Sequence, residues 1–125
     1  MTPTHDFQEL CEQLVRTAES PSARAAVQAL AEERTILDTA AARYALIVDT
    51  NGGAMSCFER LAGRQYTLGL DEQQRAFLSL VLSMVGIGLT TIAAVQDLDD
   101  RRLPIILRAI LRLAGNDTIA VGTRV

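Results

Sequence analysis

Twenty consecutive residues without a charge, Ala76 to Val95 (AFLSLVLSMVGIGLTTIAAV), constrain the fold of this chain more than any other feature. As a helix, such a run is long enough to cross the roughly 30 Å hydrocarbon layer of a membrane. It can equally be the buried axis of a helical bundle or a face that contacts another molecule. Which of these three roles the run has depends on how its apolar residues are distributed around the helix and on which apolar faces the other segments must bury.

The uncharged run is not uniform when it is placed on a helix from about 72 to 97. Small or polar residues recur every three or four positions and form one narrow seam: Ser79, Ser83, Gly86 and Thr90. Large aliphatic side chains and Phe77 fill the rest of the circumference and require an apolar cover. The seam has three interpretations: close packing of another helix of the chain, a two-fold contact with a second copy, or a pocket lined by hydroxyls.

The remaining segments also show helical periodicity. The spacing of apolar residues predicts an amphipathic helix over 5–19 and, after a Ser20-Pro21 start signal, a long Ala-rich helix over 21–49. The Asn-Gly pair at 51–52 can signal a hairpin, but neither flank alternates as a strand does, so a helix end is predicted instead. Two further helices are expected over 54–62 and 100–114, followed by a tail over 116–125.

These elements predict an all-α fold, a single domain over 1–125 with about five helices and the fourth, 72–97, buried at the centre. A chain of 125 residues can bury one core without a metal or a disulfide. An integral membrane protein is not favoured, because moving the most apolar helix into lipid leaves the other apolar faces without a centre. Arg34, a charge within the apolar seam of the helix over 21–49, is expected to pair with Asp38 or to extend to the edge of the core.

Composition narrows the classes of function. The net charge of −3 argues against a protein whose main task is to neutralise phosphates. All twelve basic residues are Arg, which we interpret as the codon bias of a GC-rich bacterial genome. The start of the chain shows no signal peptide, so a cytoplasmic location is expected. Cys11 and Cys57 are too few and too far apart for a disulfide framework or a zinc site, and both are expected to be free.

No motif in the sequence indicates catalysis. The single His5 near the start offers no base to a serine nucleophile, no Glu-x-x-His pair suggests a di-metal centre, and no glycine-rich loop follows a strand. No catalytic residue, cofactor or metal site is therefore predicted. Two groups of residues are candidate anion or partner contacts: Arg101, Arg108 and Arg112 on one side of the helix over 100–114, and Arg60, Arg64 and Tyr66 around the loop that follows the third helix.

Together these observations predict a small, non-enzymatic interaction or regulatory domain that self-associates as a homodimer or binds another protein. A nucleic-acid-binding regulator that uses the basic fifth helix is the alternative, with the negative net charge as the objection. A membrane-associated accessory protein is a further alternative.

Overall fold

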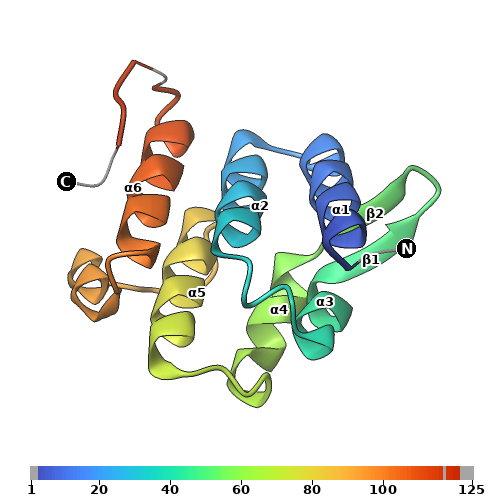
Figure 1. The fold of residues 1–125 in the computed structure, drawn as a ribbon, viewed down its shortest axis with the longest axis horizontal. Helices are drawn as coiled ribbons and strands as arrows, with labels where there is room; N and C mark the ends of the chain where they lie inside the picture. The colour runs from blue at the N-terminus through green and yellow to red at the C-terminus, as the bar shows by residue number, and fades with distance from the viewer. Residues whose placement is uncertain (1–2, 117, 122–125) are drawn as a thin grey trace.

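The computed structural model describes residues 3–116 and 118–121, and it describes side chains from Phe7 onward. Within these residues the fold is mostly helical, which confirms the predicted all-α class (Figure 1). The elements in chain order are α1 (Pro3–Thr17), α2 (Pro21–Glu33), α3 (Ala40–Leu46), β1 (Ile47–Thr50), β2 (Gly53–Ser56), α4 (Phe58–Arg64), the 3-10 helix η1 (Gln65–Thr67), α5 (Glu72–Met84), the 3-10 helix η2 (Ile92–Asp97) and α6 (Arg102–Leu113).

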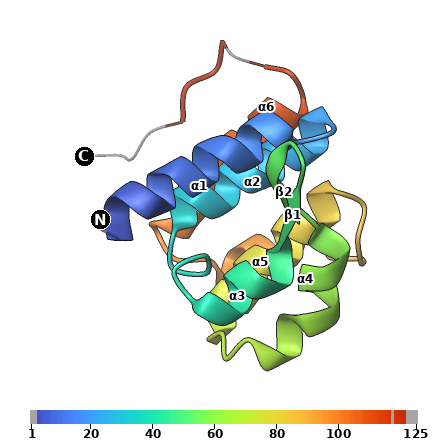
Figure 2. The same cartoon turned by 90° about the vertical axis from the view of Figure 1, so that its right-hand side faces the viewer.

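Helix α2 occupies the central position in the fold. Figure 1 shows α6, α2 and α1 in a row, and Figure 2 shows α3, α4 and α5 on the other side of the molecule from α1. Helix α2 packs against α1, α5 and α6. Ala25, Ala26 and Ala29 are buried in it, and their small side chains allow the neighbouring backbones to approach closely. The predicted central helix over 72–97 is buried as expected, with Phe77, Leu78 and Val81 fully covered, but it is shorter than predicted and shares the centre with α2.

The predicted long helix over 21–49 is interrupted at Arg34. Helix α2 ends at Glu33, and Arg34 has a φ of 72° and a ψ of −47°. The amide of Thr35 donates to the carbonyl oxygen of Glu33 at 2.9 Å, so Arg34 is the centre of a γ-turn, a strained conformation. The turn allows Ile36 and Leu37 to enter the core, where both are fully buried. Pairing of Arg34 with Asp38 is confirmed, with Nε and Oδ2 3.6 Å apart.

The rejected hairpin at Asn51-Gly52 is present. Strands β1 and β2 are antiparallel, with Ile47 opposite Ser56 and Thr50 opposite Gly53. The strands have four residues each, too short to show alternation in the sequence. Tertiary contacts with α1 support them, because the side chains of Gln13 and Thr17 bond the amide and carbonyl of Ala54 at 2.7 and 2.8 Å. The predicted third helix over 54–62 consequently begins later, at Phe58.

The uncharged run folds into two parts that differ in structure. Helix α5 begins as predicted, with a capping box between Asp71 and Gln74, but it ends at Met84. Gly86 then has a φ of 80°, and the amide of Ile87 donates to the carbonyl of Leu82 at 3.0 Å. This pattern is the Schellman motif that closes many helices. The chain therefore reverses its direction within the run, and η2 folds back against α5.

The two terminal helices agree better with the sequence. Helix α1 covers Pro3–Thr17 against the predicted 5–19, and α6 covers Arg102–Leu113 against the predicted 100–114, with Pro104 in its first turn. In the tail, residues 118–121 form no strand, and the rest of it lies outside the described residues except for Asn116.

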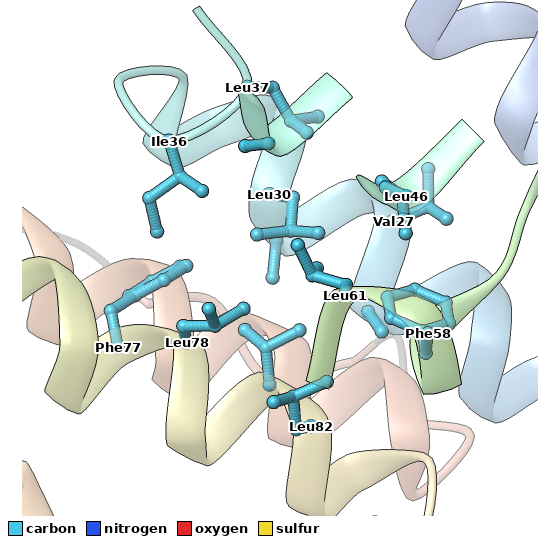
Figure 3. Close-up of a cluster of buried hydrophobic side chains, with 14 of the residues drawn as sticks. Val27, Leu30, Ile36, Leu37, Leu46, Phe58, Leu61, Phe77, Leu78 and Leu82 are labelled. Carbon is cyan, nitrogen blue, oxygen red and sulfur yellow. The ribbon is translucent and has the colours of Figure 1, made fainter. Parts of the chain in front are cut away.

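One continuous apolar cluster joins these elements. Side chains from α2, from the turn after it and from α3, α4 and α5 converge in this cluster (Figure 3). Phe77 and Leu78 of α5 are fully buried in it. Burial of such side chains is worth about 1.5–3 kcal/mol each, so the first half of the uncharged run, not its second half, supplies the core.

Candidate interaction surface

The predicted basic face of the fifth helix is occupied by acids of the same chain. Nε of Arg108 and Nη1 of Arg112 lie 3.2 and 2.9 Å from the carboxylate oxygens of Glu32. The guanidinium of Arg101 donates to the side-chain carboxylate of Glu33 at 3.1 Å and to the main-chain oxygen of Glu33 at 2.9 Å. The acid-free sequence of α6 thus has its counter-charges at the end of α2. The structure brings Arg101, Arg108 and Arg112 together along one edge of α2.

A buried polar network lies beneath this edge. The side chain of Glu33 is 0% exposed, and it is held by Arg102, which donates to Oε2 from Nε at 3.0 Å. Arg102 also bonds Asp99, with Nη1 and Oδ2 2.7 Å apart. The other partners of these two side chains are Thr35, Ile36, Gln73 and Arg101. Among the described residues no buried side-chain nitrogen or oxygen is without a partner, so the network is structural and offers no free group to a ligand.

Asp99 has an altered pKa because of this network. Slight burial raises the pKa of its carboxyl, but the hydrogen bond from the amide of Arg102 and the positive charges of Arg102 and Arg101 outweigh that effect. The pKa of Asp99 therefore lies below its ordinary value. The main-chain bond also caps the start of α6, since the amide of Arg102 donates to Oδ1 of Asp99 at 2.8 Å.

The second predicted contact group separates into two places. The guanidinium groups of Arg60 and Arg64 lie over the ring of Tyr44, 5.7 and 5.5 Å from its centroid. Arg60 also donates to the main-chain oxygen of Tyr44 at 3.1 Å. Tyr66 is not part of this arrangement; it lines a small hollow with Ser79. Sequence reasoning missed Tyr44, whose exposed ring organises the two arginines.

The predicted seam is not a continuous helical face. Ser79 and Ser83 are half-buried on α5, whereas Gly86 and Thr90 follow the end of that helix. Thr90 folds back so that its hydroxyl donates to the main-chain oxygen of Ser79 at 3.4 Å. A Cβ added to Gly86 meets no atom within 4 Å, so nothing packs closely on this glycine. Gly86 is used for its positive φ and not for its small size.

Exposed aliphatic side chains gather instead in the last third of the chain. Among the described residues, every large aliphatic side chain that is exposed follows Met84: Leu89, Ile92, Leu107, Ile110, Leu113 and Ile119. Leu107, Ile110 and Leu113 succeed each other at three-residue intervals along α6, and these exposed side chains are here called the outer face. The buried side of the same helix carries Ile105, Ile106 and Ala109. Ile110 and Leu113 each lie one turn beyond a buried residue, Ile106 and Ala109, so the outer face is the uncovered margin of the apolar side of α6.

The segment Val85–Thr91, here called the elbow, carries the most exposed of these side chains. Leu89 is 103% exposed, and Ile92, directly after the elbow, is 75% exposed. Exposing such side chains costs the folded chain the free energy that their burial would release, about 1.5–3 kcal/mol each. Several exposed aliphatic side chains in one part of the chain make that part a candidate contact site.

The hollows of the surface are weaker candidates for a functional site than the exposed aliphatic side chains. The largest, about 730 Å³, lies between the start of α2, the β2–α4 junction and the end of α5, and it is lined by serines, Glu19 and Glu59. A second, about 650 Å³, lies beside α1 and is lined by Phe7, Cys11 and Arg34. Burial raises the pKa of the Cys11 thiol, although the charges of Arg34 and Arg43 oppose this. Burial therefore favours the protonated form of this thiol.

The described residues contain no cluster of three or more His, Cys, Asp or Glu side chains able to hold a metal ion. Within the same part of the chain no helix has both the length and the apolar character needed to cross a membrane. Comparison of the chain with models of protein families, with curated proteins and with solved structures finds no match. The case for a function therefore rests on the surface itself.

Proposed function

We propose that this chain is a small, non-enzymatic interaction domain that self-associates through the outer face of α6 and the elbow. The observation that carries the proposal is the one-sided distribution of exposed aliphatic residues, all of which follow Met84 among the described residues. A second copy that covers this surface removes it from water without any new polar contact. Self-complementary apolar patches of this kind are the usual basis of two-fold dimers.

The charges around α6 favour a protein partner over nucleic acid. Arg108 and Arg112 lie on Glu32, and Arg101 and Arg102 lie on Glu33, so each of these four guanidinium groups already has a carboxylate. A phosphate backbone would have to displace these acids before it could release counterions. The exposed outer face, in contrast, consists of uncharged side chains that a protein surface can cover.

The experiment is light scattering after size exclusion, at a series of protein concentrations, on the wild type and on a Leu107→Glu/Ile110→Glu variant. We expect a dimer for the wild type and a monomer for the variant, because two carboxylates on the outer face oppose burial of that face. Tyr66→Glu is the matched control, since this exposed residue lies outside the surface and its variant should remain a dimer. Circular dichroism confirms that each variant is folded.

Two results would overturn the proposal. One is a wild-type chain that is monomeric at every concentration that can be reached. The other is a dimer that the Leu107→Glu/Ile110→Glu variant weakens no more than the Tyr66→Glu control does.

A further inference from the structure

The main tertiary contacts of residues 92–113, here called the C-terminal unit, are with α2 and α5. The unit consists of η2 and α6; α6 packs on α2 and α5, and η2 packs on α5. Its polar attachments are equally concentrated, because Arg101 and Arg102 bind Glu33 while Arg108 and Arg112 bind Glu32. A surface that holds one C-terminal unit can hold the same unit from a second copy with identical contacts.

The elbow that connects α5 to this unit depends on two left-handed glycines. Gly86 and Gly88 have φ values of 80° and 74°, and a Cβ at either position meets no atom within 4 Å. Both glycines are therefore required by the backbone conformation and not by crowding. Apart from the turns that end α5, the described hydrogen bonds of the elbow include only the 3.4 Å contact from Thr90 to Ser79 and the bond from the amide of Ala94 to Thr91. The polar contacts of the elbow are therefore few, and its remaining attachment is the packing of the half-buried Val85 and Ile87 against the core.

The same residues are also compatible with an uninterrupted helix. The spacing of apolar residues from Glu72 to Asp97 follows a helical period, and no charge occurs between Ala76 and Val95. Residues 92–97 already adopt the related 3-10 conformation. If the elbow becomes helical, α5 and η2 join into one rod, and the C-terminal unit moves away from its own α2.

We propose that two copies of this chain exchange their C-terminal units, so that α6 of each copy docks on α2 of the other. The proposal rests on the self-association proposed above and adds to it, because the exchange covers the elbow and leaves the outer face of α6 free for the contact already proposed. Every contact between α2 and α6 is remade between the copies, and the elbow is the part of the chain that changes conformation. In the exchanged dimer Leu89 and Ile92 lie on the joined helices between the two halves, where a second copy can cover them. The partner thus supplies a helix without which each half is incomplete.

Charge reversal across the interface of α2 and α6 tests the exchange directly. One variant carries Glu32→Arg, and the other carries Arg108→Glu and Arg112→Glu, so that in each variant alone α2 meets α6 with like charges. In a mixture, the two unlike chains can exchange with each other. One half of that heterodimer then pairs Arg at position 32 with Glu at positions 108 and 112, and the other half keeps the wild-type pairs. Both halves then have opposite charges in contact. The two chains are unfolded together, refolded and weighed intact by native mass spectrometry.

We expect the ratio of heterodimer to the two homodimers together to exceed its statistical value of one by several-fold. A dimer with heterodimer at the statistical share overturns the exchange while leaving self-association intact. A wild-type chain and a mixture that both stay monomeric overturn self-association and the exchange together. These results keep the two proposals separate.

A second pair of variants tests the elbow. Gly86→Ala/Gly88→Ala introduces strain at both left-handed positions and favours a helix through them, so the dimer fraction should rise several-fold above that of the wild type. Gly69→Ala is the matched control: Gly69 has a φ of 73° and equally open surroundings, but it precedes α5. A dimer fraction that falls in the elbow variant, or that rises equally in the control, contradicts the exchange.

Discussion

Glu33 and Arg102, 69 positions apart in the chain, meet in the interior with Nε 3.0 Å from Oε2. Glu33 ends α2 and Arg102 begins α6, so this pair joins the end of one helix to the start of the other. The side chain of Glu33 is 0% exposed, and that of Arg102 is 9% exposed. A buried pair of this kind fixes the position of α6 because neither charge is stable there without the other.

The first prediction concerns this pair. Glu33→Ala leaves the guanidinium of Arg102 buried with only Asp99 to compensate, and we expect the free energy of unfolding to fall by about 3 kcal/mol. Arg101→Ala is the control, because Arg101 is about half exposed and its ion pair should contribute about 0.2–1 kcal/mol. Urea unfolding followed by circular dichroism measures both values. Equal losses in the two variants would show that burial does not distinguish the pairs.

The second prediction concerns the strained turn after α2. Arg34→Gly removes the penalty of a positive φ, whereas Arg34→Ala keeps it, and both variants lose the contact of the guanidinium with the Phe7 ring, 4.5 Å from its centroid. We expect the Gly variant to be more stable than the Ala variant by about 1 kcal/mol. Thermal unfolding of the two proteins compares them directly. An Ala variant that equals or exceeds the Gly variant in stability contradicts a strained Arg34.

The fold class and several helix boundaries could be predicted from the sequence because local signals determine them. Asp71 and Gln74 form the capping box that starts α5, and Ser20 caps α2 with Pro21 in its first turn. The two interruptions could not be predicted by periodicity. Helix α2 ends at Glu33, whose ion-pair partners Arg101 and Arg102 lie far along the chain. The periodicity of neighbouring residues contains no information about such distant partners.

The candidate surface was predicted only in part, for a related reason. The arginines of α6 were recognised as a basic face, but their counter-charges on Glu32 and Glu33 belong to another helix. Leu89 and Ile92 belong to the expected buried arc only if the uncharged run is a single helix, and the structure exposes both. Gly86 and Gly88 within that run are the signal that could have indicated its end.

The third prediction concerns the two thiols. Cys11 is buried and its pKa is raised, whereas Cys57 is half-exposed at the start of α4. At about pH 8, near the ordinary thiol pKa of about 8.5, we expect a thiol reagent such as Ellman's reagent to modify Cys57 rapidly and Cys11 only as fast as the chain unfolds. Peptide mapping identifies the modified residue. Cys57→Ser should remove the rapid phase, and a rapid phase that persists in this variant would show that Cys11 is accessible.

The fourth prediction concerns the pH dependence of stability. The pKa of Asp99 is lowered in the folded state, so its ionised form stabilises the fold at pH values above the ordinary aspartate value of about 3.9. This contribution should disappear as the pH falls through the lowered value. Asp99→Asn has no such charge, so the difference in unfolding free energy between wild type and variant should shrink towards acid pH. Asp100→Asn, one position along, is the control. A difference that stays constant from neutral to acid pH contradicts the ion pair between Asp99 and Arg102.

The fifth prediction compares the two halves of the uncharged run. Leu78 is fully buried on α5, and Leu78→Ala should lower the free energy of unfolding by about 2–5 kcal/mol, because the transfer energy and the cavity both count. Leu89 is fully exposed in the elbow, and Leu89→Ala should change the stability of the monomer by less than about 0.5 kcal/mol. Urea unfolding at low protein concentration, where any dimer is dissociated, measures both. A large loss for Leu89→Ala would mean that the elbow packs within its own chain, which removes the reason for a second copy to cover it.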